Sequence, residues 1–167
     1  MKKYIIILIL MTLTLTGCGI YNINSFVLPD DLEFIQTIEQ LDTPEKICQY
    51  MFFNFKYELQ KYGVKTPYEL WKTKKGDCND FSKWVEFVGS YHGYETYQMR
   101  LIKEGINHWL GIFKIEGKYY YTDNQFYCST PYVSLEEIFN TYNLINNSKY
   151  SGYEIYKDNK LVKLWQQ

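Results

Sequence analysis

Apolar residues at helical spacing mark the first half of the chain. A first helix is predicted over residues 30–41, opening with two aspartates where the helix dipole favours anions. A second helix is predicted to begin with Thr43 as its N-cap and Pro44 at its first position, and to end at Gly63. Its apolar face comprises Ile47, Tyr50, Met51, Phe55, Leu59 and Tyr62.

Two more helices are predicted before residue 93. Thr66 and Pro67 repeat the Thr-Pro start and predict a short helix. Residues 79–92 carry apolar side chains at steps of three, one and three, and Gly93 ends this segment. This places Cys78 at the N-terminus of a helix.

The pattern then changes to strands rich in β-branched and aromatic residues, which predicts an antiparallel sheet. A short helix with a capping box is predicted over residues 134–142, followed by a hairpin over residues 153–165 that turns at Asp158 and Asn159. Because the helices come first and the strands mostly later, the fold class is α+β, with N-terminal helices packed on an antiparallel sheet. The three sheet strands are expected at residues 94–102, 107–115 and 118–123.

The N-terminus, MKKYIIILILMTLTLTGC, has two lysines, a short apolar run and small residues before Cys18. It resembles bacterial lipoprotein signals, in which processing leaves the cysteine as the lipidated N-terminus. Residues 1–17 are therefore predicted to be a signal peptide, residues 18–29 a tether and residues 30–167 one domain. Both this interpretation and the alternative of an uncleaved anchor place the domain at the cell membrane, facing away from the cytoplasm.

Net charge and composition limit the classes of partner and cofactor that are expected. The formal net charge is −1, and −3 without Lys2 and Lys3, so nucleic acid is not expected as a partner. The 18 tyrosines fit a binding surface for sugars or peptides, or a compositional drift of the source genome. Two histidines far apart, with no zinc spacing, phosphate-binding loop or dinucleotide fingerprint, predict no metal and no cofactor.

Cys78 is the candidate for chemistry. A thiol attacks as its thiolate, which a helix N-terminus and a neighbouring imidazole both favour. His92 ends the helix that Cys78 begins, about 21 Å away at 1.5 Å per residue. A disulfide from Cys78 to Cys48 or Cys128 is the alternative, and it would block the nucleophile.

His108 has a candidate partner on the next strand. A two-residue turn at 116 and 117 pairs Ile115 with Lys118, so Asp123 lies one diagonal step from His108. Side chains alternate with period two, so both project from the same face of the sheet. The aspartate would fix the imidazole tautomer, giving a Cys-His-Asp set in the order 78, 108, 123.

Residues 76–101 (GDCNDFSKWVEFVGSYHGYETYQMRL) and 107–126 (NHWLGIFKIEGKYYYTDNQF) together resemble the transglutaminase-like superfamily of papain-fold cysteine enzymes. That family has a Gly-x-Cys at a helix N-terminus, a His about 30 residues later and an Asp some 15 residues beyond. Here these are Cys78, His108 and Asp123, and the likeness covers roughly residues 43–127.

The resemblance implies a nucleophile, a general base and acid, and an orienting carboxylate, in that order. Trp71, Tyr68 and Asn107 are candidate oxyanion donors. We therefore expect a surface-anchored cysteine peptidase or amidase, or a related acyltransferase, acting on a protein or peptide, with cell-wall peptides among the candidate substrates. The alternative is a catalytically inactive binding or scaffold lipoprotein on the same fold.

Overall fold

The computed structural model describes residues 28–60 and 63–166, and its mixed α+β architecture confirms the predicted class. Residues 1–27, which hold the predicted signal peptide and most of the tether, lie outside this part. The helices are α1 (Leu32–Glu39), α2 (Pro44–Asn54), α3 (Pro67–Thr73), α4 (Cys78–Tyr91) and α5 (Leu135–Ile145). The strands are β1 (Lys56–Tyr57), β2 (Lys75–Gly76), β3 (Glu95–Lys103), β4 (Ile106–Ile115), β5 (Lys118–Asp123), β6 (Phe126–Tyr132), β7 (Gly152–Lys157) and β8 (Lys160–Gln166).

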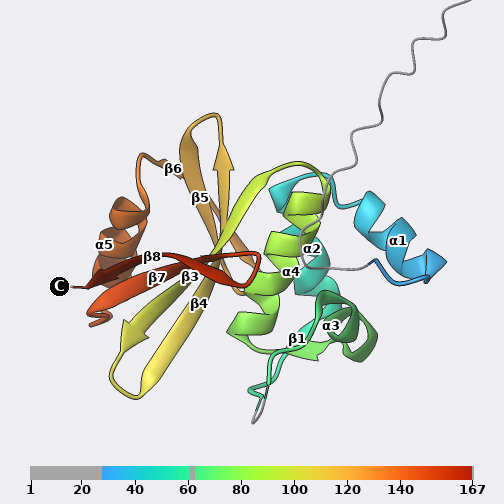
Figure 1. The fold of residues 1–167 in the computed structure, drawn as a ribbon, viewed down its shortest axis with the longest axis horizontal. Coiled ribbons are helices and arrows are strands. Elements are labelled where there is room, and N and C mark those ends of the chain that lie inside the picture. The colour runs from blue at the N-terminus through green and yellow to red at the C-terminus, as the bar shows by residue number, and fades with distance from the viewer. Residues whose placement is uncertain (1–27, 61–62, 167) are drawn as a thin grey trace, which may run out of the picture.

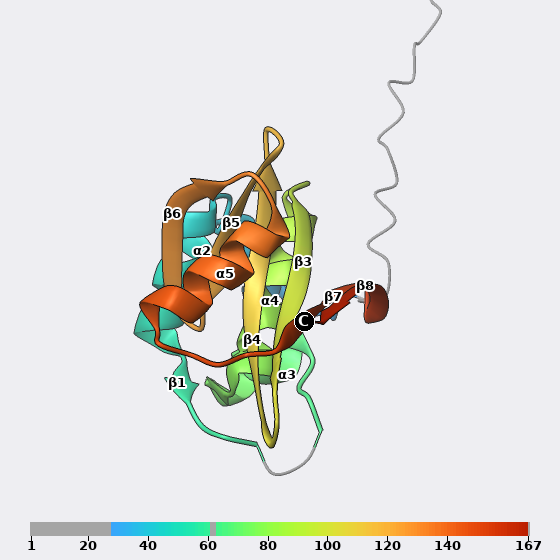
Figure 2. The same ribbon diagram turned by 90° about the vertical axis from the view of Figure 1, so that its left-hand side faces the viewer.

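The main sheet has six antiparallel strands in the order β6-β5-β4-β3-β7-β8, and β1 and β2 form a separate parallel pair. The N-terminal helices cover one face of the sheet, with α4 directly against it, and α5 covers the other face (Figures 1 and 2). None of the described helices is long and apolar enough to cross a lipid bilayer.

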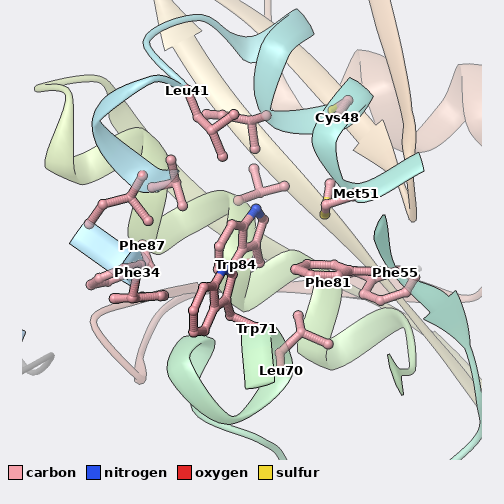
Figure 3. Close-up of a cluster of buried hydrophobic side chains, with 14 of the residues drawn as sticks. Phe34, Leu41, Cys48, Met51, Phe55, Leu70, Trp71, Phe81, Trp84 and Phe87 are labelled. Atoms are coloured by element: carbon pink, nitrogen blue, oxygen red, sulfur yellow. The ribbon is translucent and has the colours of Figure 1, made fainter. Parts of the chain in front are cut away.

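Two apolar clusters hold the layers together. The first lies among α1 to α4 around Trp84, which has no exposed surface and stacks on Tyr50 (Figure 3). The second lies between the sheet and α5, with Leu110, Ile112 and Phe139 among its members. The sheet is therefore packed on both faces, which fixes the strands that carry the candidate site.

The predicted extent of the second helix was wrong. It ends at Asn54, and Leu59, expected on its buried face, is 75% exposed. Phe55 is extended and packs its ring on Trp84 at 5.1 Å, while Lys56 N–H donates to the Lys74 carbonyl at 2.8 Å. Packing and strand pairing thus override the helical spacing of residues 55–60.

The predicted hairpin turns are confirmed. Glu116 and Gly117 join β4 to β5, and Asp158 and Asn159 join β7 to β8; all four have positive φ, as two-residue hairpin turns of this hand require. Strand β6 is not predicted by the sequence pattern; it is an edge strand that contains Pro131 and a register shift against β5.

Candidate active site

Cys78 is the first residue of α4 and is 9% exposed. Asp77 is the N-cap, and its carboxylate accepts the N–H groups of Asn79 and Asp80. Cys78 is the first helical residue, so its N–H has no acceptor within the helix and is a donor at the helix end. The predicted position of Cys78 at a helix N-terminus is confirmed.

The turn before Cys78 is held by a buried carboxylate. Asp80 is 1% exposed and accepts hydrogen bonds from the backbone N–H groups of Lys65 and Asp77, at 2.7 and 3.0 Å. Burial raises the pKa of Asp80. Gly76 lies so close that an added Cβ would stand 2.7 Å from Leu70 Cδ1 and 2.8 Å from Asp80 Cβ. Asp80 therefore acts on the loop backbone and not on the thiol.

His108 and Asp123 meet as the turn geometry predicts. Ile115 pairs with Lys118 and Leu110 with Asp123, so Asp123 is one diagonal step from His108 on the same face. His108 Nε2 and Asp123 Oδ1 are 2.8 Å apart. Asp123 is hydrogen-bonded to Nε2, and Cys78 also raises the pKa of this imidazole, which places the thiol beside the ring. The structure thus brings together all three residues of the predicted set.

These contacts set the charges of the site. Burial lowers the pKa of His108, but the hydrogen bonds to Asp123 and Cys78 outweigh it and raise the pKa from 6.5 to about 9. Burial raises the pKa of Asp123, but the hydrogen bond and charge of His108 outweigh it and leave the pKa below its usual value. At neutral pH the site therefore holds an imidazolium beside a carboxylate.

Tyr142 belongs to the same network, although no sequence signal marks it as a site residue. It comes from α5, and its hydroxyl donates to Asp123 Oδ2 at 2.8 Å. Its ring lies 5.9 Å from the imidazole of His108 at an angle of 26°. Burial and the charge of Asp123 raise the pKa of Tyr142, so its hydroxyl stays a donor at neutral pH. Tyr142 therefore holds both Asp123 and His108 in place.

The three oxyanion candidates have other surroundings. The Tyr68 hydroxyl donates to Asp31 at 2.7 Å. Trp71 is 4% exposed within the first apolar cluster, and its ring stacks on Tyr68 at 6.0 Å. Asn107 is exposed and precedes His108 on the strand, so its side chain projects from the opposite face. The Cys78 N–H is the donor placed closest to the thiol.

Within the described residues, Cys48, Cys78 and Cys128 are all free thiols. Cys48 is 3% exposed, and burial raises its pKa to about 12. Cys128 lies on β6, with its sulfur 3.9 Å from the Tyr132 hydroxyl. The structure therefore holds Cys78 as a free thiol beside His108, and not in the disulfide weighed as the alternative.

Comparison with known protein families identifies the family to which this domain belongs. Residues 30–151 match the family described as transglutaminase-like domain. The chain belongs to this family. No curated protein matches the chain. The transglutaminase-like region reaches beyond the likeness seen from the sequence, over residues 43–127, and takes in α1 and α5. Tyr142 thus lies within the transglutaminase-like domain, together with Cys78, His108 and Asp123.

Proposed function

We propose that this transglutaminase-like protein is a cysteine acyl-transfer enzyme that hydrolyses an amide or peptide bond. The observation that carries the proposal is the imidazole of His108, which is hydrogen-bonded to Asp123 and whose pKa is also raised by the neighbouring Cys78. A positioned nucleophile, base and orienting group are the arrangement that nucleophilic catalysis requires.

In the first half of the reaction, His108 accepts the proton of the Cys78 thiol, the sulfur attacks the carbonyl carbon of the substrate amide, and the C=O electron pair moves to oxygen. The Cys78 N–H, at the positive end of α4, stabilises the resulting oxyanion. The imidazolium, which the raised pKa of His108 favours, delivers this proton to the leaving nitrogen as the oxyanion re-forms the C=O bond and the C–N bond breaks. An amine leaves, and a thioester on Cys78 remains.

In the second half, neutral His108 takes a proton from water, and the hydroxide oxygen attacks the thioester carbonyl. The C–S bond breaks, the acid leaves, and the sulfur is again paired with imidazolium. A primary amine in place of water would give transamidation. Hydrolysis is favoured because water, at about 55 M, competes with any amine unless the site excludes it.

The proposed location is the outer side of the cell membrane, with Cys18 lipidated. Its support is the N-terminal sequence, whose apolar run ends in Leu-Thr-Gly-Cys. A location on the outer side of the membrane suggests extracellular proteins or cell-wall peptides as substrates. A mass increase on the N-terminal peptide that carries Cys18, absent from a Cys18→Ala variant, would support the anchor; an unmodified or uncleaved N-terminus would contradict it.

Activity is tested with a library of peptides and peptide amides, following release of amines in water and incorporation of a fluorescent primary amine. Wild type should turn over at least one substrate class, and Cys78→Ser should abolish turnover while keeping the circular dichroism spectrum of the wild type. Equal turnover by Cys78→Ser would refute the mechanism. A peptide that binds wild type and Cys78→Ser equally and is never cleaved would favour the inactive binding domain instead.

A further inference from the structure

A pocket of about 160 Å³ adjoins the candidate active site. Its lining includes Asn79, which follows Cys78 on α4, and Trp109, which follows His108 on β4. Trp109 projects from the face of the sheet that α4 covers, opposite to the face of His108, so the pocket lies between α4 and the sheet, next to the helix end that carries Cys78. Pockets for whole small molecules are usually about 300–1,000 Å³, so this one suits a single side chain of a longer substrate.

Aromatic rings form one wall of the pocket. Trp109 on β4 and Tyr156 on β7 flank β3, and their ring centroids are 5.3 Å apart. Gln98 lies deeper, 2% exposed, and its amide is held by Ser82 and Glu86. These contacts fix the walls before any ligand binds, which reduces the entropy cost of binding.

The pocket also has a cation without an opposing carboxylate. Arg100, next to Trp109, is paired with Glu154 at 2.9 Å, and Tyr156 donates to the same carboxylate. Lys83 lines the pocket and forms no ion pair within residues 28–60 and 63–166.

Two carboxylates lie three residues from Lys83 along α4, those of Asp80 and Glu86, and both are buried and hydrogen-bonded to other groups. Glu86 is 2% exposed, and it accepts from Gln98 and from the Asp158 backbone N–H. Burial raises the pKa of Glu86, which disfavours its charged form. Lys83 lowers the pKa of Glu86 through its charge but forms no ion pair with it in the part of the chain that the structure describes, so its ammonium is available to a carboxylate in the pocket.

We propose that this pocket binds an acidic side chain, glutamate or aspartate, of a peptide substrate next to the amide that Cys78 attacks. The Lys83 ammonium binds the carboxylate, Asn79 offers a hydrogen bond, and the rings of Trp109 and Tyr156 cover the methylene groups. The assignment of the bound peptide as substrate rests on the proposed function; the binding preference itself does not.

The test uses the full chain carrying Cys78→Ser, so that binding is measured without chemistry. Acetyl-Glu-Ala-Ala-amide and acetyl-Gln-Ala-Ala-amide are titrated, with the NMR shifts of the Asn79 and Trp109 N–H groups as the readout. The glutamate peptide should bind about fivefold or more tightly than the glutamine peptide, and added salt should reduce this preference. Lys83→Met should abolish the preference, and Lys83→Arg should keep it.

Lys118→Met is the matched control, because Lys118 is exposed at the start of β5, beside the Glu116–Gly117 turn. This variant should bind both peptides as the parent does. Equal affinity for the two peptides, a preference that survives Lys83→Met, or no binding of either peptide would each overturn the inference. If the proposed function is wrong, Cys78 of the wild type should be unreactive toward a thiol reagent. That result would leave the binding preference of the pocket unchanged.

Discussion

The raised pKa of His108 makes the stability of the fold depend on pH within a defined window. The folded state favours the imidazolium, with a pKa of about 9 against 6.5 when unfolded. The stabilisation is fully present below pH 6.5 and is lost as pH rises through about 9. At about 1.4 kcal/mol for each pKa unit, the difference amounts to about 3 kcal/mol. His108 is 17% exposed, so solvent screens little of it.

The assay is urea unfolding of wild type and His108→Gln at pH 6 and pH 9.5, followed by tryptophan fluorescence. Most other ionisable groups are common to both proteins and cancel in the difference. The advantage of wild type over His108→Gln should be about 3 kcal/mol larger at pH 6 than at pH 9.5. Such a change is a large part of the 5–15 kcal/mol typical of a whole domain.

A second comparison, between Cys78→Ala and the double variant Cys78→Ala/His108→Gln, separates the contributions of Cys78 and Asp123 to the pKa of His108. In a Cys78→Ala background the thiol no longer contributes, so the same comparison should keep its sign and shrink. An NMR titration of the imidazole, assigned by its absence from His108→Gln, should show a midpoint near pH 9 in the wild type. Stability profiles that run parallel for wild type and His108→Gln from pH 6 to 9.5 would refute the reasoning.

Three further predictions concern the pH dependence of turnover, the role of Tyr142 and the close packing at Gly76. Turnover should fall as pH rises through about 9, because His108 loses the proton that the leaving amine needs; a pH-rate profile that is flat from pH 7 to 10 would contradict this. Tyr142→Phe removes a hydrogen bond to a charged carboxylate and should lower the free energy of unfolding by about 2 kcal/mol. It should also raise the pKa of Asp123 and shift the acid limb of the profile to higher pH, whereas an unchanged limb would exclude the positioning role. Gly76→Ala should lower the free energy of unfolding, measured by urea titration, by about 1–3 kcal/mol, because the added Cβ would clash with Leu70 and Asp80. A variant as stable as wild type would contradict this and show that the loop shifts to accommodate the methyl group.

The meeting of His108 and Asp123 was predictable because a two-residue turn fixes the register of a hairpin. Once Glu116 and Gly117 occupy the turn, every cross-strand pair up to Leu110 and Asp123 follows. The N-terminal position of Cys78 was also predictable, because the apolar spacing of α4 begins just after it. Both signals are local, within about 15 residues, and local signals are the ones that periodicity and turn chemistry carry.

The missed features depend on contacts between distant segments. Tyr142 reaches Asp123 from a helix on the face of the sheet opposite to α4, and nothing in its own segment indicates this partner. The end of α2 is set by pairing of Lys56 with Lys75, far along the chain, against a favourable helical pattern. The pocket beside Cys78 likewise joins α4 to three strands. Such tertiary contacts override local preferences.

The central claim is that His108 activates Cys78, and the most direct measurement compares three thiols in one sample. The purified protein is treated with iodoacetamide at pH 7, and alkylation of each cysteine is followed over time by peptide mass spectrometry. Cys48 is the buried reference and Cys128 the more exposed one. Cys78 should react fastest despite its 9% exposure, and His108→Ala should slow it by about tenfold or more, leaving Cys128 unchanged. Faster reaction of Cys128, with Cys78 indifferent to His108→Ala, would contradict the account.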